Sequence, residues 1–196
     1  MENLNSSLKV DHPDLARMIS VDVETSGPNP AEFAMLAIGA CTLAEPREHF
    51  YIELQPDKPN QDASAMQVHG LDWEKHVTKG ISPGEALLRF EEWLKAHTPE
   101  GQSPLFVGFN APFDWMFLCD YFHRYLGRNP FGHSALDIKS FFMGLKRTTW
   151  QKTNMQSLSR KKLRHQAMTD ACDQADILLD LLQQQQNMPS NGGTDG

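Results

Sequence analysis

The chain has few cysteines: Cys41, Cys119 and Cys172 are the only three in 196 residues, and none stands in a C-x-x-C spacing. Neither a zinc site nor a disulfide framework is therefore expected. We predict that the three are small buried apolar residues in a reducing cytoplasm. An N-terminal apolar segment of the secretory type and an apolar run long enough to cross a bilayer are also missing. These absences predict a cytoplasmic protein with no membrane partner.

Positive charge is also scarce, because 18 Lys and Arg stand against 25 Asp and Glu and give a net charge of −7. This balance argues against a broad basic face for a polyanion. If a nucleic acid is the substrate, bound metal ions and a local basic patch must supply the attraction. Residues 160–164 (RKKLR) could form such a patch, or only a solvated helix face.

The length of the chain suits one domain with a sizeable core, and no internal repeat occurs. Residues 1–15 are polar and aperiodic, so we predict a flexible lead. Residues 16–185 carry the periodic segments and form the expected domain. Residues 183–196 are rich in Gln, Gly and Ser, which predicts a disordered tail over 186–196.

The order of the expected elements indicates an α/β fold. Three apolar runs, at 18–25, 33–43 and 48–54, are joined by connections too short for a parallel crossover and predict an antiparallel meander. Two further strands, at 105–109 and 135–138, alternate with helices expected at 113–126, 155–163 and 167–184. A helix over 82–97 has Pro83 at its first position and a capping box of Ser82 and Glu85. Residues 56–80 have no clear pattern. We therefore expect a mixed sheet flanked by helices.

The first strand carries two carboxylates that point the same way. Period-2 alternation places Asp22 and Glu24 on one face, and Val21 and Val23 on the other. Like charges at this spacing raise one another's pKa unless a cation or a proton intervenes. Hard oxygen ligands select Mg²⁺ or Mn²⁺. A solvated strand face is the competing interpretation of such a pair alone.

Two more acids and a histidine fall at helix starts. Asp114 lies in the first turn after the strand at 105–109, and Asp170 lies near the start of the last helix, five residues after His165. Each acid alone is typical of a capping residue. In an α/β sheet, however, strand ends and following helix starts converge on one edge. Four carboxylates gathered there require cations. Beside them, His165 could serve as a general base, because imidazole is the side chain suited to proton removal at neutral pH.

Three segments together resemble the motifs of the DEDDh 3′-to-5′ exonucleases, a family that includes DnaQ-like proofreading subunits and ribonuclease T. The segments are Asp22-Val23-Glu24-Thr25, Asn110-Ala111-Pro112-Phe113-Asp114 and His165-Gln166-Ala167-Met168-Thr169-Asp170. Val68-His69-Gly70-Leu71 resembles another common family segment, and Arg128-Asn129-Pro130-Phe131 with Leu136-Asp137 is similar to ribonuclease T. The resemblance spans roughly residues 17–185.

The resemblance implies a ribonuclease H-like fold, with a five-stranded mixed sheet and helices on both faces. It also implies hydrolysis of phosphodiester bonds at nucleic-acid 3′ ends, with release of nucleoside 5′-monophosphates. Two Mg²⁺ or Mn²⁺ ions would be held by Asp22, Glu24, Asp114 and Asp170, and His165 would be the base. Glu24 would also contact the terminal 3′-hydroxyl. The expected substrate-binding residues are Thr25, Ser26, His69, Asn110 and Phe113, with Trp73 and Phe141 as weaker stacking candidates and core packing as their competing interpretation.

Two other functions stay open at this stage. Asp22-Val23-Glu24-Thr25 partly imitates the strand end of haloacid-dehalogenase phosphatases, in which Asp22 would be the nucleophile, although that family has Asp where Glu24 stands. The chain could also be a module that holds a DNA polymerase. The expected partners are single-stranded or 3′-overhanging DNA or RNA, a second copy of the chain, or a polymerase, and the sequence does not choose between DNA and RNA.

Overall fold

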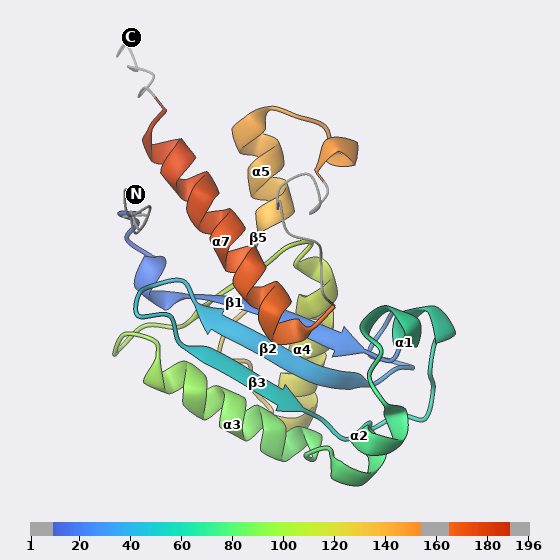
Figure 1. Cartoon of the computed structure of the whole chain (residues 1–196). Coiled ribbons are helices and arrows are strands. Elements are labelled where there is room, and N and C mark those ends of the chain that lie inside the picture. Colours follow the sequence, from blue (N-terminus) through green and yellow to red (C-terminus); the bar gives the residue numbers. More distant parts are fainter. Residues whose placement is uncertain (1–9, 154–164, 189–196) are drawn as a thin grey trace, which may run out of the picture.

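In the computed structural model, residues 10–153 and 165–188 are described, and they build one mixed sheet with helices on both faces (Figure 1). The strands are β1 (Met18–Thr25), β2 (Met35–Thr42), β3 (His49–Glu53), β4 (Leu105–Gly108) and β5 (Ala135–Asp137), in the spatial order β3-β2-β1-β4-β5. The pairs β1–β2 and β2–β3 are antiparallel, whereas β1–β4 and β4–β5 are parallel. The predicted meander and the five-stranded mixed sheet are therefore confirmed.

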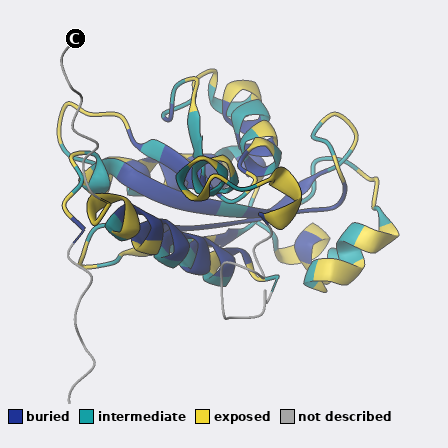
Figure 2. Ribbon diagram, turned by 90° about the horizontal axis from the view of Figure 1, so that it is seen from above, coloured by how far each residue is buried: buried dark blue, intermediate teal, exposed yellow. Residues whose placement is uncertain are grey.

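Two apolar layers hold the helices against the sheet. The helices α3 (Pro83–Ala96) and α4 (Pro112–Leu126) pack with Val21 and Val23 of β1 in one core, in which Phe90 and Phe117 are fully buried. On the other face, α5 (Ile138–Lys146) and α7 (Ala167–Gln186) pack with Met18 in a second core. Figure 1 shows α7 crossing β1 and β2, and Figure 2 shows the sheet buried between layers whose outer surfaces are exposed. Both faces of the central strands are thus covered, as expected for a buried mixed sheet.

The segment without a clear pattern contains two short helices that the sequence did not reveal. They are α1 (Ala63–His69), capped by Asp62, and α2 (Trp73–Lys79), capped by Asp72. His76 is the buried residue of the pair. Neither helix buries an apolar side chain, so neither has an apolar stripe for periodicity to detect.

The predicted capping box of α3 is wrong. Ser82 makes no side-chain capping hydrogen bond, and Glu85 instead forms an ion pair with Arg89 one turn later at 2.8 Å. Pro83 does occupy the first position of α3. A backbone N–H there would have no partner within the helix, so its absence from proline costs no hydrogen bond.

Several smaller predictions can also be compared with the structure. The three cysteines are free, but only Cys41 is buried, and Cys119 and Cys172 are half-buried. The helix expected at 155–163 and the basic run at 160–164 lie outside the described residues. Among the described helices, none combines the length and the apolar character needed to cross a membrane. The described residues also form two 3₁₀ turns, η1 (Leu15–Arg17) and η2 (Trp150–Lys152).

Candidate active site

The two acids of β1 lie on the face that α7 covers. The pleat directs Val21 and Val23 into the α3–α4 core and leaves Asp22 and Glu24 on the opposite side. The register of β1 against β2 shifts between Glu24 and Thr25, so a bulge ends the strand directly after the second carboxylate. Strand geometry therefore fixes both acids at the end of β1 next to the α7 helix.

Helix α7 delivers the third acid, and a glycine lets it approach closely. Gly39 of β2 pairs with Asp22, and a Cβ on Gly39 would lie 2.1 Å from the backbone carbon of Ala167. Only glycine permits this contact between the sheet and the first turn of α7. As a result, ligand oxygens of Asp22, Glu24 and Asp170 all lie within 4.8 Å of one another. We call these three residues the acid cluster.

Asp114 reaches the same edge from the other side of the sheet. Asn110 has a left-handed backbone (φ 59°), which turns the chain after β4, and Pro112 then begins α4. Asp114 is 5% exposed, and its Oδ1 accepts a 3.0 Å hydrogen bond from the backbone N–H of Val23. Its carboxylate is thus tied to the strand between Asp22 and Glu24.

Burial and mutual repulsion make the carboxylates hard to ionise. Burial, followed by the charges of Asp114, Glu24 and Asp170, raises the pKa of Asp22 well above its usual range. Burial and the neighbouring acids raise the pKa of Glu24 to about 8, and burial raises the pKa of Asp114 to about 7. Within the described part of the chain, no lysine or arginine forms an ion pair with Asp22, Glu24 or Asp114. A site of this kind suits divalent cations, since hard oxygen ligands without a protein counter-charge are what Mg²⁺ and Mn²⁺ require.

One polar partner of the cluster was missed by the sequence. Gln174 donates from Nε2 to Oδ1 of Asp22 at 2.8 Å, and its Oε1 accepts from the backbone N–H of Phe109 at 2.9 Å. It lies one helical turn after Asp170, so an i, i+4 search on the last helix could have found it. Gln174 links β1, α7 and the end of β4 at the cluster.

A pocket of about 430 Å³ opens beside the acid cluster. Its lining includes Glu24 from β1, His69 from α1, and Tyr51 and Glu53 from β3. His165, two residues before α7, and Met168, in the first turn of α7, complete it on the other side. His165 has a left-handed backbone (φ 51°), an uncommon conformation for a residue with a side chain. The structure therefore brings the predicted residues His165, Glu24 and His69 together. It adds Tyr51 and Glu53 of β3, which no sequence motif had indicated.

His69 forms part of the wall as a neutral imidazole. The backbone N–H of Leu71 donates to its Nδ1 at 3.0 Å, so Nε2 carries the proton and donates to the carbonyl of Thr25 at 3.2 Å. Burial lowers the pKa of His69, in agreement with this tautomer. The contact joins α1 to the end of β1.

The remaining predicted substrate-binding residues are not in the lining of this pocket, and two of them make internal hydrogen bonds. The Thr25 hydroxyl donates to the carbonyl of Gly27, and that of Ser26 donates to the carbonyl of Asn60 and accepts from the N–H of Ala34. Asn110 is exposed at the turn before α4, and Phe113 is half-buried against Phe117. Trp73 and Phe141 are also half-buried, the latter in the second core. Substrate contacts by these residues stay predictions.

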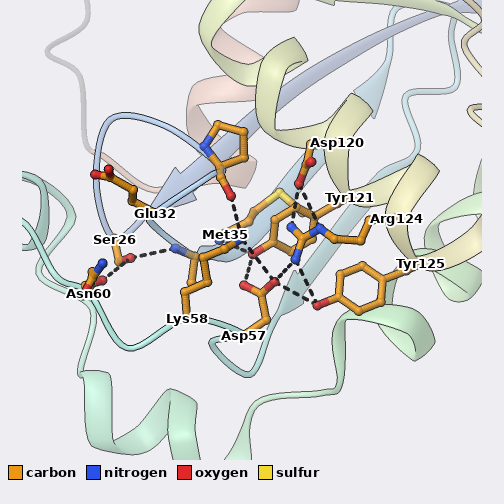
Figure 3. Close-up of polar contacts among 12 residues, drawn as sticks. Ser26, Glu32, Met35, Asp57, Lys58, Asn60, Asp120, Tyr121, Arg124 and Tyr125 are labelled. Atoms are coloured by element: carbon orange, nitrogen blue, oxygen red, sulfur yellow. Dashed lines mark hydrogen bonds and ion pairs between the residues drawn. The ribbon is translucent and has the colours of Figure 1, made fainter.

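A polar network centred on Asp57 joins three segments of the fold (Figure 3). Asp57 accepts hydrogen bonds from Tyr121 at 2.5 Å and Tyr125 at 2.8 Å, and it pairs with Arg124. The Tyr121 hydroxyl in turn accepts from the backbone N–H of Met35, the residue that pairs with Thr25 across the bulge. The network joins α4 to the start of β2 and to the segment that leads into α1.

Comparisons with known proteins agree on one chemistry. A family model described as the Rv2179c-like 3′-5′ exoribonuclease domain matches residues 17–182. The 3′-5′ DNA exonuclease Cap18 of Escherichia coli is 41% identical over 177 residues, which are 87% of this chain and 95% of that protein.

Solved structures agree in fold. The nuclease domain of 3′hExo, a DEDDh family member bound to rAMP, matches with a TM-score of 0.68 at 13% identity, over 85% of this chain and 90% of that one. A 3′-exonuclease described for 3′-end specific recognition of a histone mRNA stem-loop matches with a TM-score of 0.69 at 14% identity. The match covers 85% of this chain and 63% of that longer chain. The ribonuclease H-like fold expected from the motifs is thus confirmed.

Proposed function

Because the chain belongs to the Rv2179c-like family of 3′-5′ exonucleases, we propose that the acid cluster, with Asp114, is the metal centre at which it cuts the terminal phosphodiester. The observation that carries this proposal is the gathering of three carboxylates within 4.8 Å, where burial and the neighbouring acids raise the pKa of Asp22 and of Glu24. Two divalent cations, Mg²⁺ or Mn²⁺, would be held by Asp22, Glu24, Asp114 and Asp170. The phosphatase alternative is not favoured, since the family model and the relatives are all exonucleases.

Bound cations would supply an activated water and would neutralise the charge that builds on the phosphate. The protein's own part begins with His165, which takes the proton from the attacking water. Its left-handed backbone at the start of α7 supports this role, because strained non-glycine residues gather at functional sites. Glu24 lines the pocket and would also accept a hydrogen bond from the terminal 3′-hydroxyl.

The pocket suits one terminal nucleotide. Its about 430 Å³ lie between His69 and Leu71 on one side and Tyr51 on another, which offers aromatic and apolar surface for a base. Single strands present such an unstacked terminal base, so we propose a single-stranded 3′ end as the substrate. DNA is the first choice, because the relative that is 41% identical is a DNA exonuclease, and RNA is the alternative that the family description favours. A homodimer, a polymerase partner and a cytoplasmic location stay predictions.

The test is a digestion panel with 5′-labelled 20-nucleotide DNA and RNA, single-stranded and with 3′ overhangs, in Mg²⁺, Mn²⁺ or EDTA. We expect a ladder that shortens from the 3′ end, 5′-monophosphate products and no cleavage in EDTA. The variant Asp170→Asn should lose at least about 100-fold in rate. Asp180→Asn changes an exposed acid on the same helix and should cleave normally. Equal rates in both variants would contradict the assignment.

A further inference from the structure

The charges of this chain are strongly segregated along the sequence. Residues 138–169 hold eight of its 18 Lys and Arg and not one Asp or Glu, while the rest of the chain carries ten Lys and Arg against 25 acids. An acidic protein that binds a polyanion must concentrate its cations somewhere, and this segment is where they are. The part of the segment that the structure describes before residue 154 comprises α5 and η2.

An exposed tryptophan and a lysine lie together in this basic segment. Trp150 opens η2 with 46% of its surface exposed, and Nζ of Lys139 lies 3.8 Å from the centroid of its ring. The turn is well built, since buried Thr153 donates from both its hydroxyl and its N–H to the carbonyl of Trp150. An aromatic ring that stays exposed to solvent beside an ammonium group forgoes the free energy that its burial would contribute. The same pair offers a stacking surface for a base and a charge for a phosphate.

This pair is anchored to the edge that carries the active site. Lys139 is in the first turn of α5, directly after Asp137 at the carboxyl end of β5. Asp137 accepts a 3.1 Å hydrogen bond from the N–H of Ala111, in the turn that leads to Asp114. The strand β5 lies two positions from β1, which is about 10 Å across the sheet. A bound strand of a few nucleotides covers the distance between these two strands.

We propose that Trp150 and Lys139 form a second binding point for single-stranded nucleic acid, which holds nucleotides upstream of the 3′ end while the end itself lies in the pocket. The inference rests on the proposed function, because it assumes that the pocket takes the terminal nucleotide. Trp150 stacks on a base and Lys139 neutralises a phosphate. The contact makes affinity depend on substrate length and does not depend on base identity.

The test separates this surface from the chemistry by using two substrates. One is a 20-nucleotide single strand with a 5′ fluorophore, whose binding is followed by fluorescence anisotropy in EDTA. The other is the 4-nitrophenyl ester of thymidine 5′-monophosphate, which is too small to reach Trp150. Trp150→Ala should raise Kd and KM for the 20-mer about tenfold, the size of one lost base–aromatic stack, and should leave ester hydrolysis within about twofold. Trp150→Phe keeps a ring and should recover most of the affinity.

Lys139→Ala should reduce the slope of log Kd against log salt by about 0.7, the value for one phosphate contact on a single strand. Lys95→Ala, on α3 against the opposite face of the sheet, removes the same charge and is the control. The proposal is overturned if the Trp150 and Lys139 variants bind the 20-mer like Lys95→Ala, or if they slow both substrates equally. A wild-type protein that binds the 20-mer in EDTA but hydrolyses neither substrate with Mg²⁺ or Mn²⁺ would instead refute the proposed function.

Discussion

Three carboxylates at the site, those of Asp22, Glu24 and Asp114, are held in surroundings that disfavour their charge. The pKa of Glu24 is raised to about 8 and that of Asp114 to about 7, mainly by burial, and that of Asp22 is raised by burial and by its acidic neighbours. A carboxyl group with a raised pKa in the folded state binds a proton more tightly there than in the unfolded chain. Its contribution to folding is therefore complete below about pH 4 and is lost as the pH rises toward 8.

Because these pKa values are raised, the metal-free protein should become less stable as the pH rises. In EDTA, Tm should fall by roughly 5 °C or more between pH 5 and pH 8.5. Mn²⁺ should raise Tm more at pH 8.5 than at pH 5, because binding requires deprotonated ligands. Differential scanning fluorimetry across this range tests both statements. The variant Asp22→Asn should flatten the profile in EDTA, whereas Glu100→Gln, an exposed acid between α3 and β4, should not. A profile that rises with pH in EDTA would show that the carboxylates are ionised without metal.

The side chain of Gln174 contacts Asp22, which we propose as a metal ligand. It joins Asp22 to the backbone at Phe109, so we expect it to set the direction in which the Asp22 oxygens point. Gln174→Ala should weaken Mn²⁺ binding about tenfold or more, the usual cost of losing a group that supports a metal ligand. Isothermal titration calorimetry measures this directly, and saturating metal should restore much of kcat. Gln185→Ala, an exposed residue on the same helix, is the matched control. Unchanged metal affinity in the Gln174 variant would leave the residue with a packing role alone.

At the scale of elements, the site depends on how closely α7 approaches the sheet. A Cβ on Gly39 would lie 2.2 Å from the Met168 nitrogen, so even alanine must displace the first turn of the helix. That turn carries Asp170 and follows His165. Gly39→Ala should therefore lower kcat/KM at least about 100-fold while the far end of α7 stays packed.

The control for this change is Gly84→Ala on α3, where the nearest atom to a new Cβ is 4.0 Å away. That variant should be neutral or slightly stabilising, since alanine is the better helix former by up to about 1 kcal/mol. Exonuclease rates and circular dichroism on both variants separate a lost site from a lost fold. Normal turnover in Gly39→Ala would mean that the helix start can shift without moving the acids.

The sequence predicted the elements that a pattern of neighbouring residues reveals, such as strand alternation or a short connection. The alternation in β1 placed Asp22 and Glu24 correctly on one face, and short connections implied the antiparallel meander. The helices α1 and α2 gave no such signal, because they are seven residues long and bury almost nothing. The roles of Gly39 and Tyr51 were not predictable either, since each depends on which segment lies across from it in three dimensions.

At the scale of the whole molecule, the two apolar cores support different parts of the site. The α3–α4 core supports the strands from one side, and the α5–α7 core fixes the helix that completes the acid cluster. The second core includes a residue from the segment that the sequence assigned to a flexible lead: Val10 is 8% exposed and packs in this cluster. Gln186 near the end of α7 also donates to the carbonyl of Asp11. The boundary at residue 16 stays a prediction, and these contacts argue for an earlier one.

Two shortened chains decide where the domain begins. A chain that starts at residue 10 keeps the Val10 contact, whereas one that starts at residue 16 loses it. Burying a valine contributes about 1.5–3 kcal/mol, so the shorter chain should unfold at a correspondingly lower urea midpoint with a similar m-value. Val10→Ala in the full chain should reproduce part of this loss, and Val77→Ala, on the exposed surface of α2, should reproduce none of it. Because α7 depends on the second core, the chain from residue 16 should also bind Mn²⁺ more weakly. Equal midpoints for the two shortened chains would place the start of the domain at residue 16, and Val10 would then be a passive neighbour of α7.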